Sequence, residues 1–150
     1  MLKFIRESAG QSLVEMALGL PLLVFGLLGG ADLARAYALQ LAVQNGARAG
    51  AEAAAIDFAP TRSTITTRTR DEMDRTPGMN SAAATITVTF KQTDGATDCI
   101  DPPTPAMPCY ATVRVQYTFR TITPWPWIPN TYVFDRTNTF RTIKGGALPT

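Results

Sequence analysis

The chain has 150 residues, enough for one modest folded domain and an anchoring segment. It contains no histidine, the commonest general base and metal ligand, and its two cysteines cannot form a four-ligand zinc site alone. Its formal net charge of +2 is spread along the chain, which does not suggest a nucleic-acid partner. The composition argues against an enzyme, and we expect no catalytic residue, no cofactor and no metal.

An uncharged apolar run extends from residue 16 to residue 31, behind a short basic leader. From Glu15 to Asp32, a helix rising about 1.5 Å per residue covers roughly 25 Å, close to the ~30 Å hydrocarbon core of a bilayer. We therefore expect a membrane segment at about residues 13–31. A cleaved secretory signal peptide is the alternative, because it also joins a basic start to an apolar run. Gln11 and Glu15 at the start of the run, and the helical pattern beyond it, count against that alternative.

The helical pattern continues after the apolar run. Residues 27–55 contain no proline and are rich in Ala, Leu, Gln and Arg, which predicts one helix over residues 11–59 that ends at Pro60. Pro21 lies inside the apolar run and should kink the helix, either as a tolerated defect or as a packing feature.

Residues at every fourth position of this helix separate into rows of different character. A polar row contains Asp32 and Gln40, and an apolar row contains Leu33, Tyr37 and Leu41. A third row contains only small residues, and it either reflects an Ala-rich helix or allows the helices of several neighbouring subunits to approach closely. Its members are Gly26, Gly30, Ala34, Ala38, Ala42, Gly46, Gly50 and Ala54.

Residues 10 to about 55 also carry several specific motifs. The segment begins with "GQSLVE", continues with "LGLPLL", and then contains "ADLARAY" and "QNGARAGA". It resembles a type IV prepilin at its start and, more narrowly, the TadE-like family of the tight-adherence (Tad) pilus system. Met16 departs from the Tyr that major pilins of this system usually carry. The polar positions of these motifs are Asp32, Arg35, Asn45 and Arg48.

The resemblance implies that a prepilin peptidase removes residues 1–10 by cutting between Gly10 and Gln11. Glu15 would then neutralise the freed α-amine of Gln11, because residues four apart lie on one helix face about 6 Å apart along the axis. Alternatively, Glu15 simply lies at the level of the lipid headgroups. The implied partners are other pilins and pseudopilins, the Tad assembly machinery, the peptidase and membrane lipid.

Residues 60–150 are expected to form an extracytoplasmic α+β head. Residues 61–75 predict a short surface helix whose acidic and basic side chains neutralise one another. Alternating apolar and polar residues predict antiparallel strands near residues 83–91, 110–121 and 131–143, with a Thr-rich face in solvent and an apolar face on the far half of the long helix.

Two connections in the head have distinctive compositions. Cys99 and Cys109 flank a proline-rich stretch, and outside the cytoplasm such a pair is most simply a disulfide. The nearby aspartates, including Asp94, miss the EF-hand spacing. Trp125 and Trp127 lie on a proline-rich connection, where they could form a contact patch, lie at a membrane interface or pack beneath the loop.

Together these features predict an α+β protein in which a long N-terminal transmembrane helix forms a stalk packed by a small antiparallel head. We expect a TadE-like pseudopilin or minor pilin of a Tad pilus, in the cytoplasmic membrane with its N-terminus inside and its head outside. Two alternatives are a single-pass anchor for an extracytoplasmic binding module and a secreted protein with a cleaved signal peptide.

Overall fold

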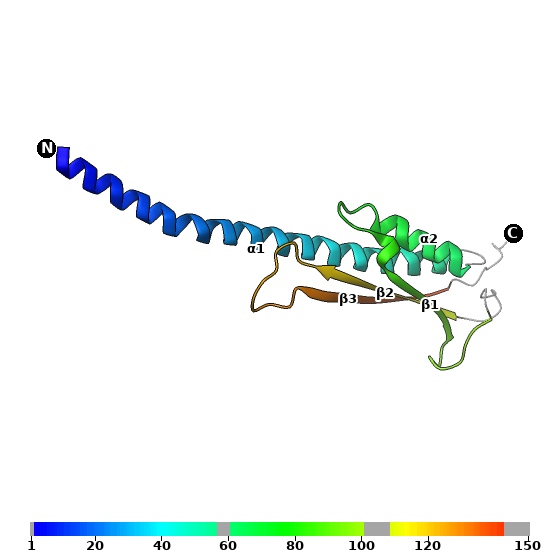
Figure 1. Cartoon of the computed structure of the whole chain (residues 1–150). Coiled ribbons are helices and arrows are strands. Elements are labelled where there is room, and N and C mark those ends of the chain that lie inside the picture. Colours follow the sequence, from blue (N-terminus) through cyan, green and yellow to red (C-terminus); the bar gives the residue numbers. More distant parts are fainter. Residues whose placement is uncertain (1, 57–60, 101–108, 143–150) are drawn as a thin grey trace.

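The fold is described from a computed structural model, shown in Figure 1. The structure describes residues 2–56, 61–100 and 109–142, and for residues 2–9 the backbone alone. A long helix projects far beyond a small head that packs along its C-terminal half (Figure 1). The predicted α+β class is confirmed. The elements are α1 (Leu2–Ile56), α2 (Arg62–Met73), a 3₁₀ helix η1 (Ser81–Ala83), β1 (Thr85–Gln92), β2 (Cys109–Arg120) and β3 (Thr131–Arg141).

The helix α1 begins earlier than predicted, because it runs without interruption through the leader to Ile56. The predicted helix end at Pro60 lies outside the described residues. Pro21 lies within α1, which curves gently along its length (Figure 1). The apolar segment and the part that carries the head are therefore one continuous helix.

The second helix, α2, packs along the C-terminal part of α1. Its first turn is capped by Thr61, whose side-chain oxygen accepts a hydrogen bond from the backbone N–H of Thr64 (3.1 Å). Ile65, Thr69 and Met73, four residues apart, form its buried face. The predicted charge neutralisation is present in part, in the ion pair between Arg75 and Glu72 (3.1 Å) and in the charge of Arg70 acting on Asp74.

The three strands form an antiparallel sheet in the order β1-β2-β3. Their apolar side chains alternate as predicted, with Val88 opposite Val113 and Phe134 opposite Tyr117 on the face that covers α1. The other face is rich in threonine, and the hydroxyls of Thr112 and Thr139 lie 2.9 Å apart on it. The strands start or end within two residues of the predicted bounds, apart from residue 143, which lies outside the described part.

The core lies between α1, α2 and the sheet, and the row of α1 that it buries contains Leu39, Val43 and Ala47. By contrast, Leu33 and Tyr37 remain 73% and 64% exposed. Small α1 residues allow the close approach of α2 and β2, so the helix packs through shape more than through large apolar side chains.

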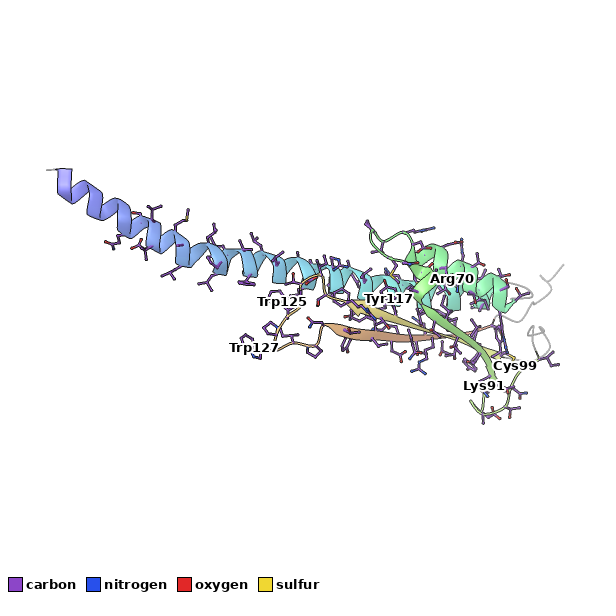
Figure 2. The ribbon with its side chains drawn as sticks, in the orientation of Figure 1. Arg70, Lys91, Cys99, Tyr117, Trp125 and Trp127 are labelled. Carbon is purple, nitrogen blue, oxygen red and sulfur yellow. A yellow bond between two sulfur atoms is a disulfide. The ribbon has the colours of Figure 1, made fainter. Side chains whose placement is uncertain are left out.

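A disulfide joins Cys99 to Cys109, as predicted. Cys109 is the first residue of β2, and Cys99 follows a bridge between Lys91 and Asp98 at the end of β1. Their Cα atoms lie 6.3 Å apart. The bond therefore ties the middle of the long β1–β2 connection to the start of β2, at the end of the head remote from the apolar segment (Figure 2).

Candidate functional site: the apolar helix and its junction with the head

The part of α1 from residue 16 to residue 31 is apolar on all sides. The large apolar side chains of α1 between residues 13 and 28 are 40–75% exposed, and they belong to Leu13, Val14, Met16, Leu18, Leu20, Leu22, Leu23, Val24, Phe25, Leu27 and Leu28. A helix that is apolar all round requires lipid or other helices around it. In the described chain one helix, Gly10–Ile56, is long and apolar enough to cross a membrane, a property that membrane anchors share with signal sequences.

The predicted processing and pairing residues lie near the start of this segment. The side-chain amide of Gln11 donates a hydrogen bond to a carboxylate oxygen of Glu15 (3.1 Å). Helical side chains lean toward the N-terminus, which is why Glu15 reaches back over the preceding turn. A Cβ added to Gly10 would meet no described atom within 4 Å. The structure thus brings Gln11 and Glu15 into contact beside an uncrowded glycine.

The predicted small-residue row divides into two parts. Open space surrounds Gly26 and Gly30, where a Cβ would meet no described atom within 4 Å, and Ala34 is exposed. Ala38 is half-buried at the edge of the head.

The C-terminal part of the row packs inside the chain. A Cβ on Gly46 would lie 2.4 Å from Cγ of Met73, and a Cβ on Gly50 would lie 2.1 Å from Oγ1 of Thr69. The small size of residues 46 and 50 therefore allows α2 of the same chain to pack closely on α1. The exposed positions of the row, up to Ala34, remain open to close approach by another chain.

Asp32 joins the end of the apolar segment to the head. Its carboxylate accepts hydrogen bonds from the backbone N–H groups of Ile122 (2.9 Å) and Thr123 (3.2 Å), and from the indole N–H of Trp125 (3.4 Å). Arg35 donates a fourth at 3.1 Å. These bonds, that of Ile122 foremost, hold the pKa of Asp32 below its ordinary value although burial acts in the opposite direction. A residue 5% exposed thereby fixes a segment 90 positions away in the sequence.

The segment fixed by Asp32 is the connection between β2 and β3, residues 121–130, called here the β2–β3 loop. Trp125 packs on α1. Its ring lies 3.4 Å from the point that a Cβ added to Gly29 would occupy, and its ring centroid lies 6.4 Å from the ring centroid of Phe25. The side chain of Asn130 closes the loop, accepting from the N–H of Trp125 (2.6 Å) and donating to its carbonyl (3.2 Å). In Figure 2 Trp125 lies against the helix and Trp127 lies farther from it.

The other polar motif residues do not join Asp32 in one cluster. The guanidinium of Arg35 lies 5.6 Å from the ring centroid of Phe119, and so it belongs to the same junction. Arg48 forms a surface ion pair with Glu52 (2.8 Å), and Asn45 is exposed beside it. Sequence reasoning grouped these residues by motif, and it missed the role of Asp32 because the groups that bind this carboxylate are remote in the sequence.

The aspartates after β1 serve the turn. Asp94 accepts hydrogen bonds from the backbone of Ala96 and Thr97, and Asp98 pairs with Lys91 at 2.7 Å. Asp101, the third aspartate of the stretch, lies outside the described residues. Within the described ranges, no three His, Cys, Asp or Glu side chains gather into a metal site.

The structure thus combines an extended apolar helix with a small α+β head on the C-terminal half of that helix. Residues 10–52 match the family model described as TadE-like protein, which confirms the resemblance seen in the motifs of this segment. The match covers the apolar segment and most of the head-bearing part of α1, and it supports a pilin-like role related to the Tad pilus. No curated protein and no solved structure matched the chain.

Proposed function

We propose that this protein is a TadE-like pseudopilin, a non-enzymatic subunit that is anchored in the cytoplasmic membrane and takes part in assembling a Tad pilus, within the filament, at its tip or at its base. The observation that carries the proposal is the coincidence of the TadE-like match with a helix whose apolar half projects free of the head. An apolar segment of that kind can be surrounded by lipid before assembly and by the helices of neighbouring subunits after it.

Exposed small residues support assembly through this helix. Gly26 and Gly30 have open space around them, and Ala34 continues the row toward the head. Small residues at four-residue spacing let helix backbones approach closely, where van der Waals contact drives association in lipid. The partners are thus other pilins and pseudopilins of the same system, with their own apolar helices.

The contact between Gln11 and Glu15 supports a role for this acid once the chain is cut after Gly10. Cutting there would place a positive α-amine on Gln11, one turn from the Glu15 carboxylate. A charge pair about 4 Å apart is worth about 4 kcal/mol at an effective dielectric of 20, and an unpaired acid at the centre of a membrane helix costs about 2.5–3.5 kcal/mol. Pairing, within the chain or with a neighbour, therefore offsets the cost of the acid.

The proposed topology has residues 1–10 on the cytoplasmic side and the head outside. Basic residues in the leader favour its retention in the cytoplasm, and the Cys99–Cys109 disulfide suits an oxidising compartment. A periplasmic reporter fused to the C-terminus should be active, and activity confined to a cytoplasmic reporter would overturn this topology.

The decisive experiment is mass spectrometry of the protein's N-terminus in membrane fractions and in pili sheared from cells. We expect a mature chain that begins at Gln11, and Gly10→Val should leave a precursor ten residues longer because the added side chain crowds the scissile bond. Gly19→Val is the matched control, since it adds the same bulk away from the cut at a glycine outside the small-residue row, where a Cβ would meet no described atom within 4 Å. A retained Met1 would favour the simple anchor, and cleavage after the apolar run with release from the membrane would favour the secreted protein.

A further inference from the structure

The β2–β3 loop combines features that the docking at Asp32 does not explain. Trp125 packs on α1, but Trp127 is 92% exposed, and Ile122 and Ile128 are 68% and 63% exposed. From Thr121 to Thr131 the sequence contains no charged residue. A group of large apolar side chains therefore projects from one end of the head without contributing to its core.

The loop lies beside the apolar part of α1. Its Trp125 contacts Gly29 and Phe25, which precede Asp32 by three and seven residues, or by about 4–10 Å along a helix. If the hydrocarbon segment ends near Asp32, these contacts place Trp125 among the upper acyl chains, next to the interfacial layer, which is about 5–8 Å thick on each side of the hydrocarbon core. Figure 2 places both tryptophans at the end of the head nearest the N-terminal half of α1.

The backbone of the loop is also suited to a site with little water. The N–H groups of Ile122 and Thr123 donate to Asp32, and that of Trp125 donates to Asn130. Prolines at positions 124, 126 and 129 have no N–H to satisfy. A loop with few free donors enters an interfacial layer at lower cost than an ordinary solvated loop, because unsatisfied polar groups are costly in lipid.

We propose that the β2–β3 loop is an interfacial membrane anchor, in which Trp127, Ile122 and Ile128 insert among the headgroups and upper acyl chains of the outer leaflet. Tryptophan is the residue best suited to this layer, since its ring is apolar and its indole N–H can bond to water or headgroups. The proposal rests on the membrane-spanning role of α1 proposed above. It makes the head a two-point attachment, by the helix and by the loop, with Asp32 holding the two together.

The test uses the full chain reconstituted into phosphatidylcholine–phosphatidylglycerol vesicles. The chain contains two tryptophans, so Trp125→Phe leaves Trp127 as the single fluorophore and Trp127→Phe leaves Trp125. We expect the emission of Trp127 to shift to the blue on reconstitution, to be quenched by lipids brominated near the headgroup end of their acyl chains, and to become severalfold less sensitive to aqueous acrylamide than in unfolded protein. The unsubstituted chain, measured in parallel, should show the same bromolipid quenching and thus guards against loss of docking in Trp125→Phe.

Alkaline extraction of the same vesicles reports separately on the helix. Protein that resists extraction while Trp127 stays accessible to acrylamide and insensitive to brominated lipid would overturn the loop anchor and leave the spanning helix intact. Protein released by alkali would overturn the membrane assignment itself, and the loop proposal with it. Protection of Trp127 that appears only at high protein-to-lipid ratio, without bromolipid quenching, would mean that the loop binds a second copy, which also overturns the proposal.

Discussion

Adding a single methyl group at Gly50 should destabilise the head, and removing the hydroxyl and the γ-methyl group of Thr69 from α2 should reverse the effect. A Cβ at residue 50 would lie 2.1 Å from Oγ1 of Thr69, and 3.4 Å from Cβ of the same residue and from Cγ1 of Val113. Thr69 is fully buried and its hydroxyl donates to the carbonyl of Ile65 (2.9 Å), so it has little freedom to turn away. Only the contact with Oγ1 is too close for a methyl group.

The expected magnitudes follow from two opposing effects. Overpacking a buried site costs about 1–3 kcal/mol, whereas Gly→Ala within a helix contributes about 1 kcal/mol of stability. Gly50→Ala should therefore lower the free energy of unfolding by about 1 kcal/mol. In a Thr69→Ala background the clash is absent, and the same substitution should raise the free energy by up to about 1 kcal/mol. The predicted coupling is about 2 kcal/mol, within the range measured for residues in contact.

The assay is urea unfolding of the full chain in detergent micelles, followed by near-ultraviolet circular dichroism of the head. The control is Gly30→Ala, because the added methyl would meet no described atom within 4 Å. It should not destabilise the head, and any gain from the helix preference of alanine should stay within about 1 kcal/mol. Equal destabilisation by Gly50→Ala in both backgrounds would refute the proposed clash. Unchanged stability with lost co-purification of other pilins would show instead that Gly50 serves a neighbouring chain.

Three other predictions concern the two ends of the molecule and its junction. Glu15→Leu should reach the membrane at normal abundance but co-purify poorly with other pilus components, because the freed amine would lose its partner. The co-purification of Glu15→Gln should be intermediate. Normal assembly of Glu15→Leu would show that Glu15 only lies at the membrane interface. Hydrogen bonds lower the pKa of Asp32, so docking of the β2–β3 loop should be complete above about pH 4 and be lost as the pH falls through the lowered pKa. Indole fluorescence should report this loss, and Asp32→Asn should abolish its dependence on acid. Non-reducing peptide mapping should find Cys99 joined to Cys109, and replacing both by serine should cost about 2–3 kcal/mol of head stability; freely alkylated thiols in envelope protein would contradict the bond.

Local patterns predicted the elements of this fold well. Alternation in the strand sequences identified β1, β2 and β3, and a proline-free, Ala-rich stretch identified the head-bearing part of α1. These signals lie within single segments and depend on the periods of helix and strand. The spacing of Gln11 and Glu15 likewise placed them on one helix face, although the group that contacts Glu15 in the structure is the side-chain amide of Gln11 and the predicted pair with its α-amine stays a prediction.

The packing of α1 could not be predicted in the same way. The apolar row with Leu33 and Tyr37 stays exposed, and the head covers the side of Val43 and Ala47 instead. Several rows of an Ala-rich helix are apolar enough to be buried, so the choice depends on the shape of α2 and the sheet. The bonds from the β2–β3 loop to Asp32 were equally out of reach, since they join segments 90 residues apart.

The continuity of α1 has a mechanical consequence. One unbroken helix passes from the apolar segment into the core of the head, so axial tension applied at either end is carried by the same series of backbone hydrogen bonds. The hydrogen bonds between Asp32 and the β2–β3 loop hold α1 where it leaves the head, and they resist bending of the helix there. Bending of α1 is then concentrated at Pro21, where one backbone hydrogen bond is missing, eleven residues before Asp32. The head and the part of α1 that follows Pro21 should tilt as one stiff unit about Pro21.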